Sequence, residues 1–189
     1  MSTPYRRNPH DPYALVPFSD ELLDEVSRAA ESSPRRRSII RLHEHDDTVQ
    51  RMFNAIRTNS YARPHRHSDP DKTEVFVALR GMLLVVRFSD DGAPIEGVLI
   101  REEGPVRGVE IPAGAWHSVV SLDNRTVLFE VMHGPYDANS HKNFAPWAPP
   151  EDDRKAGLAF IANLRAHFAL TIPEVAALNA LAEEDKDVF

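Results

Sequence analysis

The stretch from residue 59 to residue 132 constrains the fold more than any other part of the sequence, because it consists of short apolar runs separated by turn residues. Turn signals stand at Gly81, at Asp90-Asp91-Gly92 and at Asp123-Asn124. No helical periodicity interrupts the stretch, which disfavours a parallel α/β fold. The pattern predicts a mainly β protein built as a barrel or a sandwich. The expected strands cover residues 74–79, 82–88, 95–100, 109–111, 116–122 and 126–132.

The residues before this stretch predict two helices and a short strand. Ser19 can cap a helix over 19–31, in which the apolar side chains fall on one face. A short strand follows near residues 39–42. A second helix is expected over 48–57, because apolar residues recur there at helical spacing. Those residues are Val49, Met52, Phe53 and Ile56.

The residues after the β-rich stretch are expected to form a loop and then helices. A capping box at 171–174 begins a final helix that continues through Leu178 and Leu181. We therefore expect four segments along the chain. They are an irregular N-terminal arm at 1–18, a helical segment at 19–58, a barrel with its C-terminal loop at 59–151, and a helical extension at 152–189.

Composition excludes several classes of function. The chain of 189 residues has no cysteine, which rules out disulfides, thiolate-bound metal and thiol catalysis. Its 22 basic and 29 acidic residues give a net charge of −7, so bulk attraction to nucleic acid or to an anionic membrane is not expected. We find no targeting segment and no run of about 20 apolar residues, and the expected location is therefore the cytoplasm.

Three histidines and one glutamate form the sharpest chemical feature. His65 and His67 are two residues apart, so on an extended strand both imidazoles point to the same face. Glu74 heads the next expected strand, and His117 begins another just beyond a turn that contains Pro112 and Gly114. Three neutral imidazoles and a carboxylate suit Fe, Mn, Ni or Zn, with one or two coordination positions left for water or substrate. An isolated His-x-His pair, by contrast, is more often two surface histidines on an edge strand.

In combination, these residues resemble the two signature motifs of the cupin superfamily. The first motif corresponds to the His65-x-His67 pair, Glu74 and Gly81, and the second to Pro-x-Gly-x-x-His ending at His117. The resemblance implies a cupin double-stranded β-helix barrel of the jelly-roll type, and a homodimer. One departure is that the loop 68–73 makes the spacing from His67 to Glu74 longer than the usual three or four residues. The three histidines are therefore the principal expected ligands of one divalent metal ion, and Glu74 is the expected fourth.

Further segments resemble the WbuC family of cupin-fold metalloproteins across about residues 19–151. They are RLH, TVQRMFNAI, Tyr61 before PHRH, VEIPAGAWHS, FEVMHGPYD and KNFAPWAPPE. Members of that family are associated with bacterial O-antigen and polysaccharide gene clusters. The resemblance thus implies the fold and the metal, together with a link to polysaccharide metabolism. The tail 152–189 is not part of the family pattern.

Other polar residues are candidates for binding a ligand at the mouth of the barrel. The segment 134–151 could close over the metal pocket, or its aromatic residues could simply plug the outer wall. Glu130 could orient a ligand imidazole if it faces inward, and would be solvated if it faces outward. His43 and His45 fit helix-cap chemistry, and His133 fits a surface position. We assign no role to His10, His141 or His167. The candidate ligand-binding residues are Tyr61, Arg66, Tyr136 and Lys142.

Three classes of function are compatible with these residues. One of them is a structural cupin whose metal only stabilises the barrel. The first is an enzyme, such as a metal-dependent isomerase, lyase or dioxygenase-type cupin, that acts on a sugar or sugar-nucleotide derivative. The second is a non-catalytic metal-dependent protein that binds or senses a small molecule, with an acidic sugar as one candidate. A sensor coupled to DNA is disfavoured, because the tail carries Glu183, Glu184, Asp185 and Asp187 and no basic recognition helix.

Overall fold

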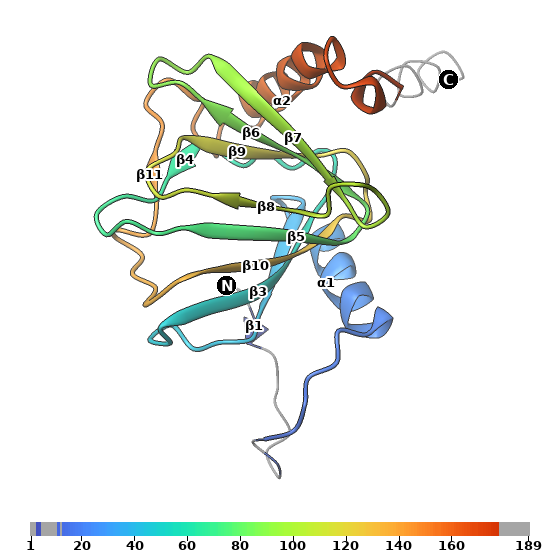
Figure 1. The fold of residues 1–189 in the computed structure, drawn as a ribbon, viewed down its shortest axis with the longest axis vertical. Coiled ribbons are helices and arrows are strands. Elements are labelled where there is room, and N and C mark those ends of the chain that lie inside the picture. Colours follow the sequence, from blue (N-terminus) through green and yellow to red (C-terminus); the bar gives the residue numbers. More distant parts are fainter. Residues whose placement is uncertain (1–2, 5–10, 12, 178–189) are drawn as a thin grey trace.

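The computed structural model of the protein describes residues 3–4, 11 and 13–177 (Figure 1). Strands dominate it, and most of them lie between residues 37 and 144. In chain order the elements are β1 (Thr3–Pro4), α1 (Asp20–Ser32), β2 (Arg37–Arg41), β3 (Val49–Ile56), β4 (His65–Arg66), β5 (Glu74–Arg80), β6 (Met82–Phe88), β7 (Pro94–Arg101), β8 (Gly108–Ile111), β9 (His117–Ser121), β10 (Val127–His133), β11 (Asn143–Phe144) and α2 (Arg154–Ala169).

Two sheets face each other and form a β-barrel. The larger sheet has the order β1-β2-β3-β10-β5-β8, and the smaller has the order β11-β4-β9-β6-β7. All neighbouring strands are antiparallel except β1 and β2. The strands predicted between residues 74 and 132 are confirmed to within two residues at each end. The predicted mainly β, cupin-type barrel is thus the observed fold.

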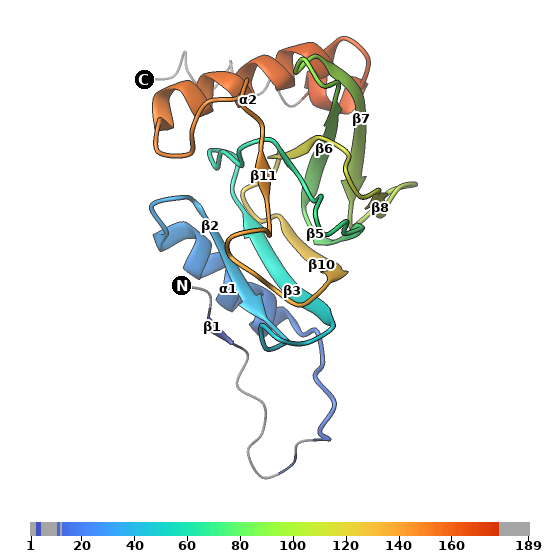
Figure 2. The same cartoon turned by 90° about the vertical axis from the view of Figure 1, so that its left-hand side faces the viewer.

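The two helices lie on opposite outer faces of the barrel (Figures 1 and 2). Helix α1 begins at the cap Ser19, whose side chain accepts a hydrogen bond from the Leu22 amide. Its buried face packs against the outer side of the larger sheet, including Phe53 and Val127. Helix α2 covers the outer side of the smaller sheet through Ile161, Leu164 and Phe168. A third apolar cluster fills the interior between the sheets.

The prediction of a helix over 48–57 is wrong, because Val49–Ile56 form strand β3. This strand lies between β2 and β10 in the larger sheet. Phe53 and Ala55 point outward against α1, whereas Ile56 points into the interior cluster. Since both faces of the strand are covered, apolar residues occur on both, and the sequence loses the alternation that marks a half-exposed strand. The segment 19–58 is therefore helical only over α1.

The terminal predictions are met in part. Residues 3–4 of the arm form β1, and residues 173–177 begin a helix at the predicted capping box. The predicted continuation through Leu178 and Leu181 lies outside the described residues. No helix among the described residues is both long enough and apolar enough to cross a membrane.

Candidate metal centre

The structure brings His65, His67, Glu74 and His117 together inside the barrel. Strand β4 carries His65, and His117 is its direct partner at the start of β9. His67 follows β4 on the same face, and Glu74 begins β5 in the opposite sheet. All four are buried, each with at most 6% of its surface exposed. The loop between His67 and Glu74 is fixed by Lys72, whose buried ammonium donates a hydrogen bond of 2.6 Å to the Pro135 carbonyl.

The three imidazoles are oriented by backbone carbonyls. The Nδ1 atoms of His65, His67 and His117 lie 3.0, 2.6 and 2.9 Å from the carbonyl oxygens of residues 63, 141 and 115, respectively. A carbonyl can only accept, so each Nδ1 carries a proton, and Nε2 presents a lone pair whenever the ring is neutral. Metal-binding histidines in proteins are commonly held by this kind of outer hydrogen bond.

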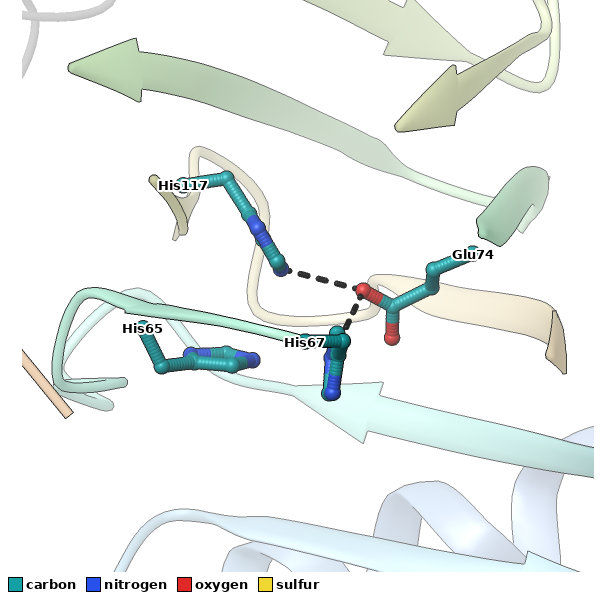
Figure 3. A group of neighbouring side chains, drawn as sticks. All are labelled: His65, His67, Glu74 and His117. Carbon is teal, nitrogen blue, oxygen red and sulfur yellow. Dashed lines mark ion pairs between the residues drawn. The ribbon is translucent and has the colours of Figure 1, made fainter. Parts of the chain in front are cut away.

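The four atoms that point inward have no other use in the structure. The three Nε2 atoms and Glu74 Oε2 are buried and have no hydrogen-bond partner among the described residues. Glu74 Oε2 lies 3.0 Å from His117 Nε2 and 3.5 Å from His67 Nε2 (Figure 3). One potential ligand atom from each residue lies within 4.8 Å of the others. Donor atoms crowded in this way require a positive charge between them, either a proton on an imidazole or a metal ion, so the group fits a metal ion.

The electrostatics keep His65 and Glu74 in the forms that bind a metal. Burial lowers the pKa of His65 well below its ordinary value, and the charge of Lys142 lowers it further, so this imidazole is neutral. Burial opposes the ionisation of Glu74, but the adjoining His117 and His67 outweigh it and hold the pKa of Glu74 well below its usual range. Neutral imidazoles and an ionised carboxylate are the forms that bind a metal.

A second carboxyl group lies beside Glu74. Glu130 on β10 faces the interior, which settles the orientation that the sequence left open, and it accepts a hydrogen bond of 3.0 Å from Asn54 Nδ2. Burial, together with the charge of Glu74, raises the pKa of Glu130 to about 8. Glu130 therefore interacts with the carboxylate of Glu74.

The segment 134–151 runs alongside the cluster. Its strand β11 pairs with β4, and the Ala145 amide donates to the Pro64 carbonyl. The His141 carbonyl orients His67, and the His141 ring lies 5.2 Å from the His67 ring. Burial lowers the pKa of His141 to about 3. The sequence showed no convergent partner for His141, and the structure places it against His67; the separation of 74 residues left no local signal that could have shown this contact.

The four candidate ligand-binding residues lie in different places. Tyr61 packs beneath α2 and its hydroxyl donates to the Pro149 carbonyl at 2.8 Å, so its hydroxyl is not presented to the cluster. Arg66 points away from the barrel interior and lies over the Trp116 ring at 4.5 Å. Tyr136 is 36% exposed and stacks between the rings of His45 and His141, at 4.7 Å from each. Lys142 is close enough to His65 and Glu130 to shift the pKa of both.

His43 and His133 are not part of the cluster. His43 is buried, and its Nδ1 lies 2.8 Å from the Arg51 amide nitrogen and 2.6 Å from the Arg51 carbonyl oxygen, so it joins β3 to the preceding segment and caps no helix. His133 is exposed at the end of β10, as predicted for a surface residue.

A cavity of about 260 Å³ reaches the cluster between the two sheets. His117 is among the residues that line it, and apolar residues of both sheets form much of its walls. The lining comes mainly from β6, β7, β8 and β9, and β7 and β8 are edge strands of the smaller and the larger sheet. A small molecule in this cavity can therefore approach His117.

Comparisons with known proteins agree with this architecture. A family model described as a domain of unknown function, DUF6016, matches residues 18–100, which is less than half of the chain. No curated protein matches the sequence. Among solved structures, the capsular polysaccharide assembling protein CapF from Staphylococcus aureus aligns with a TM-score of 0.50 and 18% identity, over 59% of this chain and 30% of that chain.

Two further structures align less closely. An oxalate oxidase in complex with the substrate analogue glycolate gives a TM-score of 0.44 and 18% identity, over 74% of this chain and 76% of that chain. A cupin superfamily protein from Desulfitobacterium hafniense DCB-2 gives 0.43 and 11%, over 57% and 86%. The described chain spans less than a third of the CapF chain that it matches. The two-sheet topology agrees with the expected cupin-type barrel, and the barrel contains a group of residues that could hold a metal ion.

Proposed function

We propose that the protein is a mononuclear metal-binding cupin in which His65, His67, Glu74 and His117 bind one divalent Fe, Mn, Ni or Zn ion. The observation that carries this proposal is the set of four buried, inward-pointing donor atoms that lack hydrogen-bond partners among the described residues. Backbone carbonyls already hold the imidazoles in the required tautomer, so little reorganisation accompanies binding. Four protein ligands leave one or two positions free for water or a substrate oxygen.

When bound, such an ion would act as a Lewis acid toward an oxygen atom of a ligand. The residues of the chain supply the remaining requirements. The walls of the cavity exclude water from the ligand, and the Lys142 ammonium contributes a positive charge near His65. Glu130 offers a second interior carboxyl group that the donor set itself does not need.

We further propose that the ligand is a sugar or sugar-nucleotide type of small molecule in polysaccharide metabolism, and that the protein belongs to the WbuC family. Two similarities support this. The segments quoted above resemble that family, and the CapF structure carries the description of a capsular polysaccharide assembling protein. A metal-dependent isomerase, lyase or dioxygenase-type reaction fits this chemistry. The alternative is a non-catalytic metal-dependent binding or sensor protein, which would bind the same ligand and leave it chemically unchanged.

Elemental analysis of protein purified without a metal-affinity tag tests the metal centre. We expect one transition-metal ion per chain in the wild type and none in the double variant His65→Ala/His67→Ala, because two of the four donors are lost. The matched control is His133→Ala, which removes an exposed histidine of the same barrel and should keep its metal. Full metal content in the double variant, with an unchanged circular dichroism spectrum, would contradict the assignment.

We also propose a cytoplasmic homodimer. The free edges of β7 and β8 offer unpaired backbone groups that invite pairing with another chain. Light scattering at micromolar concentration should give twice the mass of the chain, and a monomer would reject the dimer.

A further inference from the structure

The register of β6 places an arginine next to the metal centre. Arg87 pairs directly with His117 on β9 and with Glu96 on β7. Residues that are directly opposite in an antiparallel pair point to the same face of the sheet, so Arg87 and Glu96 face the interior as His117 does. Val85, two residues before Arg87, belongs to the interior apolar cluster and confirms this direction. All four residues line the cavity.

The Arg87 side chain is held in place and still has free donors. Its Nε atom donates a hydrogen bond of 2.7 Å to Glu96 Oε2. The two side chains are 49% and 53% exposed, so they lie at the open end of the cavity. Among the described residues the Arg87 side chain has no other hydrogen bond, and its two terminal amino groups are therefore available to solvent or to a ligand. A pair of such amino groups matches the two oxygens of a carboxylate.

A second cation lies on the other side of the cluster. In the pairing of β11 with β4, Phe144 is opposite His65 and Asn143 is opposite Arg66. Continuing this register by one residue places Lys142 opposite His67, on the interior face. No hydrogen bond or ion pair of Lys142 occurs among the described residues. The proposed metal centre thus lies between two cationic side chains. Arg87 is at the rim of the cavity, and Lys142 is beside β4.

The cavity is lined by only one cation. Of its charged residues, Arg87 is positive, whereas Glu96 is bonded to Arg87 and Glu110 is exposed on β8. Glu96 can also accept a hydrogen bond from a hydroxyl group, since a carboxylate has more lone-pair positions than Arg87 occupies. The volume of about 260 Å³ is below the range of roughly 300–1,000 Å³ that is typical of pockets for drug-sized ligands. A molecule of monosaccharide size fits these limits better than a sugar nucleotide.

We propose that Arg87 is the carboxylate anchor of this site, and that the ligand is a small hydroxylated carboxylic acid such as a sugar acid. Its carboxylate binds the terminal amino groups of Arg87, one hydroxyl group binds Glu96, and the remainder extends along the apolar walls toward His117. The Lys142 charge favours the same anionic ligand from the inner side. This inference rests on the proposed metal-binding function. It narrows the proposed ligand from any sugar-type small molecule to an acidic one, and it gives that ligand a defined orientation.

Isothermal titration calorimetry on the metal-loaded, full-length protein tests the anchor. The probes are D-galacturonate and D-galactose, which differ only in having a carboxylate or a hydroxymethyl group at C6. We expect the wild type to bind galacturonate at least tenfold more tightly than galactose, because a charge-assisted pair of hydrogen bonds is available only to the acid. Arg87→Met should remove this preference, and Arg87→Lys should restore part of it.

The controls separate this proposal from the metal assignment. Arg125→Met removes an exposed arginine that lies outside the cavity, and it should keep the wild-type preference. The metal content of Arg87→Met should remain one ion per chain; wild-type protein that lacks metal would instead count against the proposed function. If metal-loaded wild type shows no preference for galacturonate, or if Arg87→Met keeps it, the anchor is wrong. Lys142→Ala should also weaken galacturonate binding. Unchanged binding in this variant would show that Lys142 does not contribute to the anion site and that Arg87 does.

Discussion

Replacement of Glu130 by glutamine should change how the stability of the metal-free protein depends on pH. Glu130 is buried beside the carboxylate of Glu74, and its pKa is raised to about 8 from an ordinary value of 4.5. The folded state therefore retains a proton that the unfolded chain has already released in the range between these two values. By linkage, the free energy of unfolding falls as the pH rises through this range, and the loss is complete only above pH 8.

The expected size of the effect follows from the two pKa values. Between pH 6.5 and pH 8.5 the unfolded carboxyl is ionised throughout, whereas the folded carboxyl changes from mostly protonated to mostly ionised. The wild type should lose about 2 kcal/mol of stability over this interval. His65 and His141 do not interfere in this range: burial lowers the pKa of both imidazoles, so the stability linked to them is lost only as the pH falls below the unfolded value of 6.5.

Glutamine reproduces the protonated form of Glu130. Its amide oxygen can accept from Asn54 Nδ2, and its amide nitrogen can donate to Glu74, at every pH. The stability of the Glu130→Gln variant relative to the wild type should therefore increase by about 2 kcal/mol between pH 6.5 and pH 8.5, because residue 130 no longer titrates in the variant. The assay is urea unfolding of chelator-treated protein at intervals of half a pH unit.

The exposed Glu103 provides the matched control, because Glu103→Gln changes the charge by the same amount at the surface. Its pH profile should follow that of the wild type. If Glu130→Gln and the wild type give parallel profiles between pH 6.5 and pH 8.5, Glu130 does not hold a proton in the folded state, and the reasoning from burial and the Glu74 charge fails.

Two further predictions concern the contact of Tyr61 with the outer helix. Tyr61→Phe should cost about 1 kcal/mol of stability, because it leaves the Pro149 carbonyl without its hydrogen bond. It should not change metal content or galacturonate affinity. A drop in that affinity would show that Tyr61 belongs to the ligand site. Gly157→Ala should destabilise the protein by about 1–2 kcal/mol, as measured by thermal unfolding. A Cβ atom at this position would lie 2.6 Å from Tyr61 Cγ, and the cost of this overpacking outweighs the gain in helix propensity. The exposed Asn163→Ala on the same helix should be neutral or slightly stabilising, and a stabilised Gly157→Ala variant would show that α2 does not pack on Tyr61 as described.

Some features of the centre depended on spacing and could be predicted. His65 and His67 share a face because a strand repeats every two residues, and His117 follows the turn that positions β9 beside β4. Turn residues between β5 and β10 likewise marked the ends of the strands. These signals are local, so a single sequence contains them.

The orientation of the other interior side chains could not be predicted from the local sequence. Glu130 and Arg87 belong to the site only because β10 and β6 turn those faces inward, and period-2 alternation alone does not say which face is inside. Strand β3 lost its alternation because α1 covers its outer face, so its apolar residues matched a helical spacing. Tyr61 was expected at the mouth, but α2 packs over it.

Local periodicity and turn residues in the sequence predicted the strands from β5 to β10. The spacing of His65 and His67, together with the resemblance to the cupin motifs, predicted the group of four residues that the structure brings together. Only the tertiary structure decided which carboxyl lies beside Glu74, which carbonyl orients His67, and which arginine borders the cavity. These contacts join segments that are far apart in the chain, such as His67 and His141. They exist because two sheets close on each other, and the free energy of that closure depends on packing across the whole barrel and not on any local run of residues.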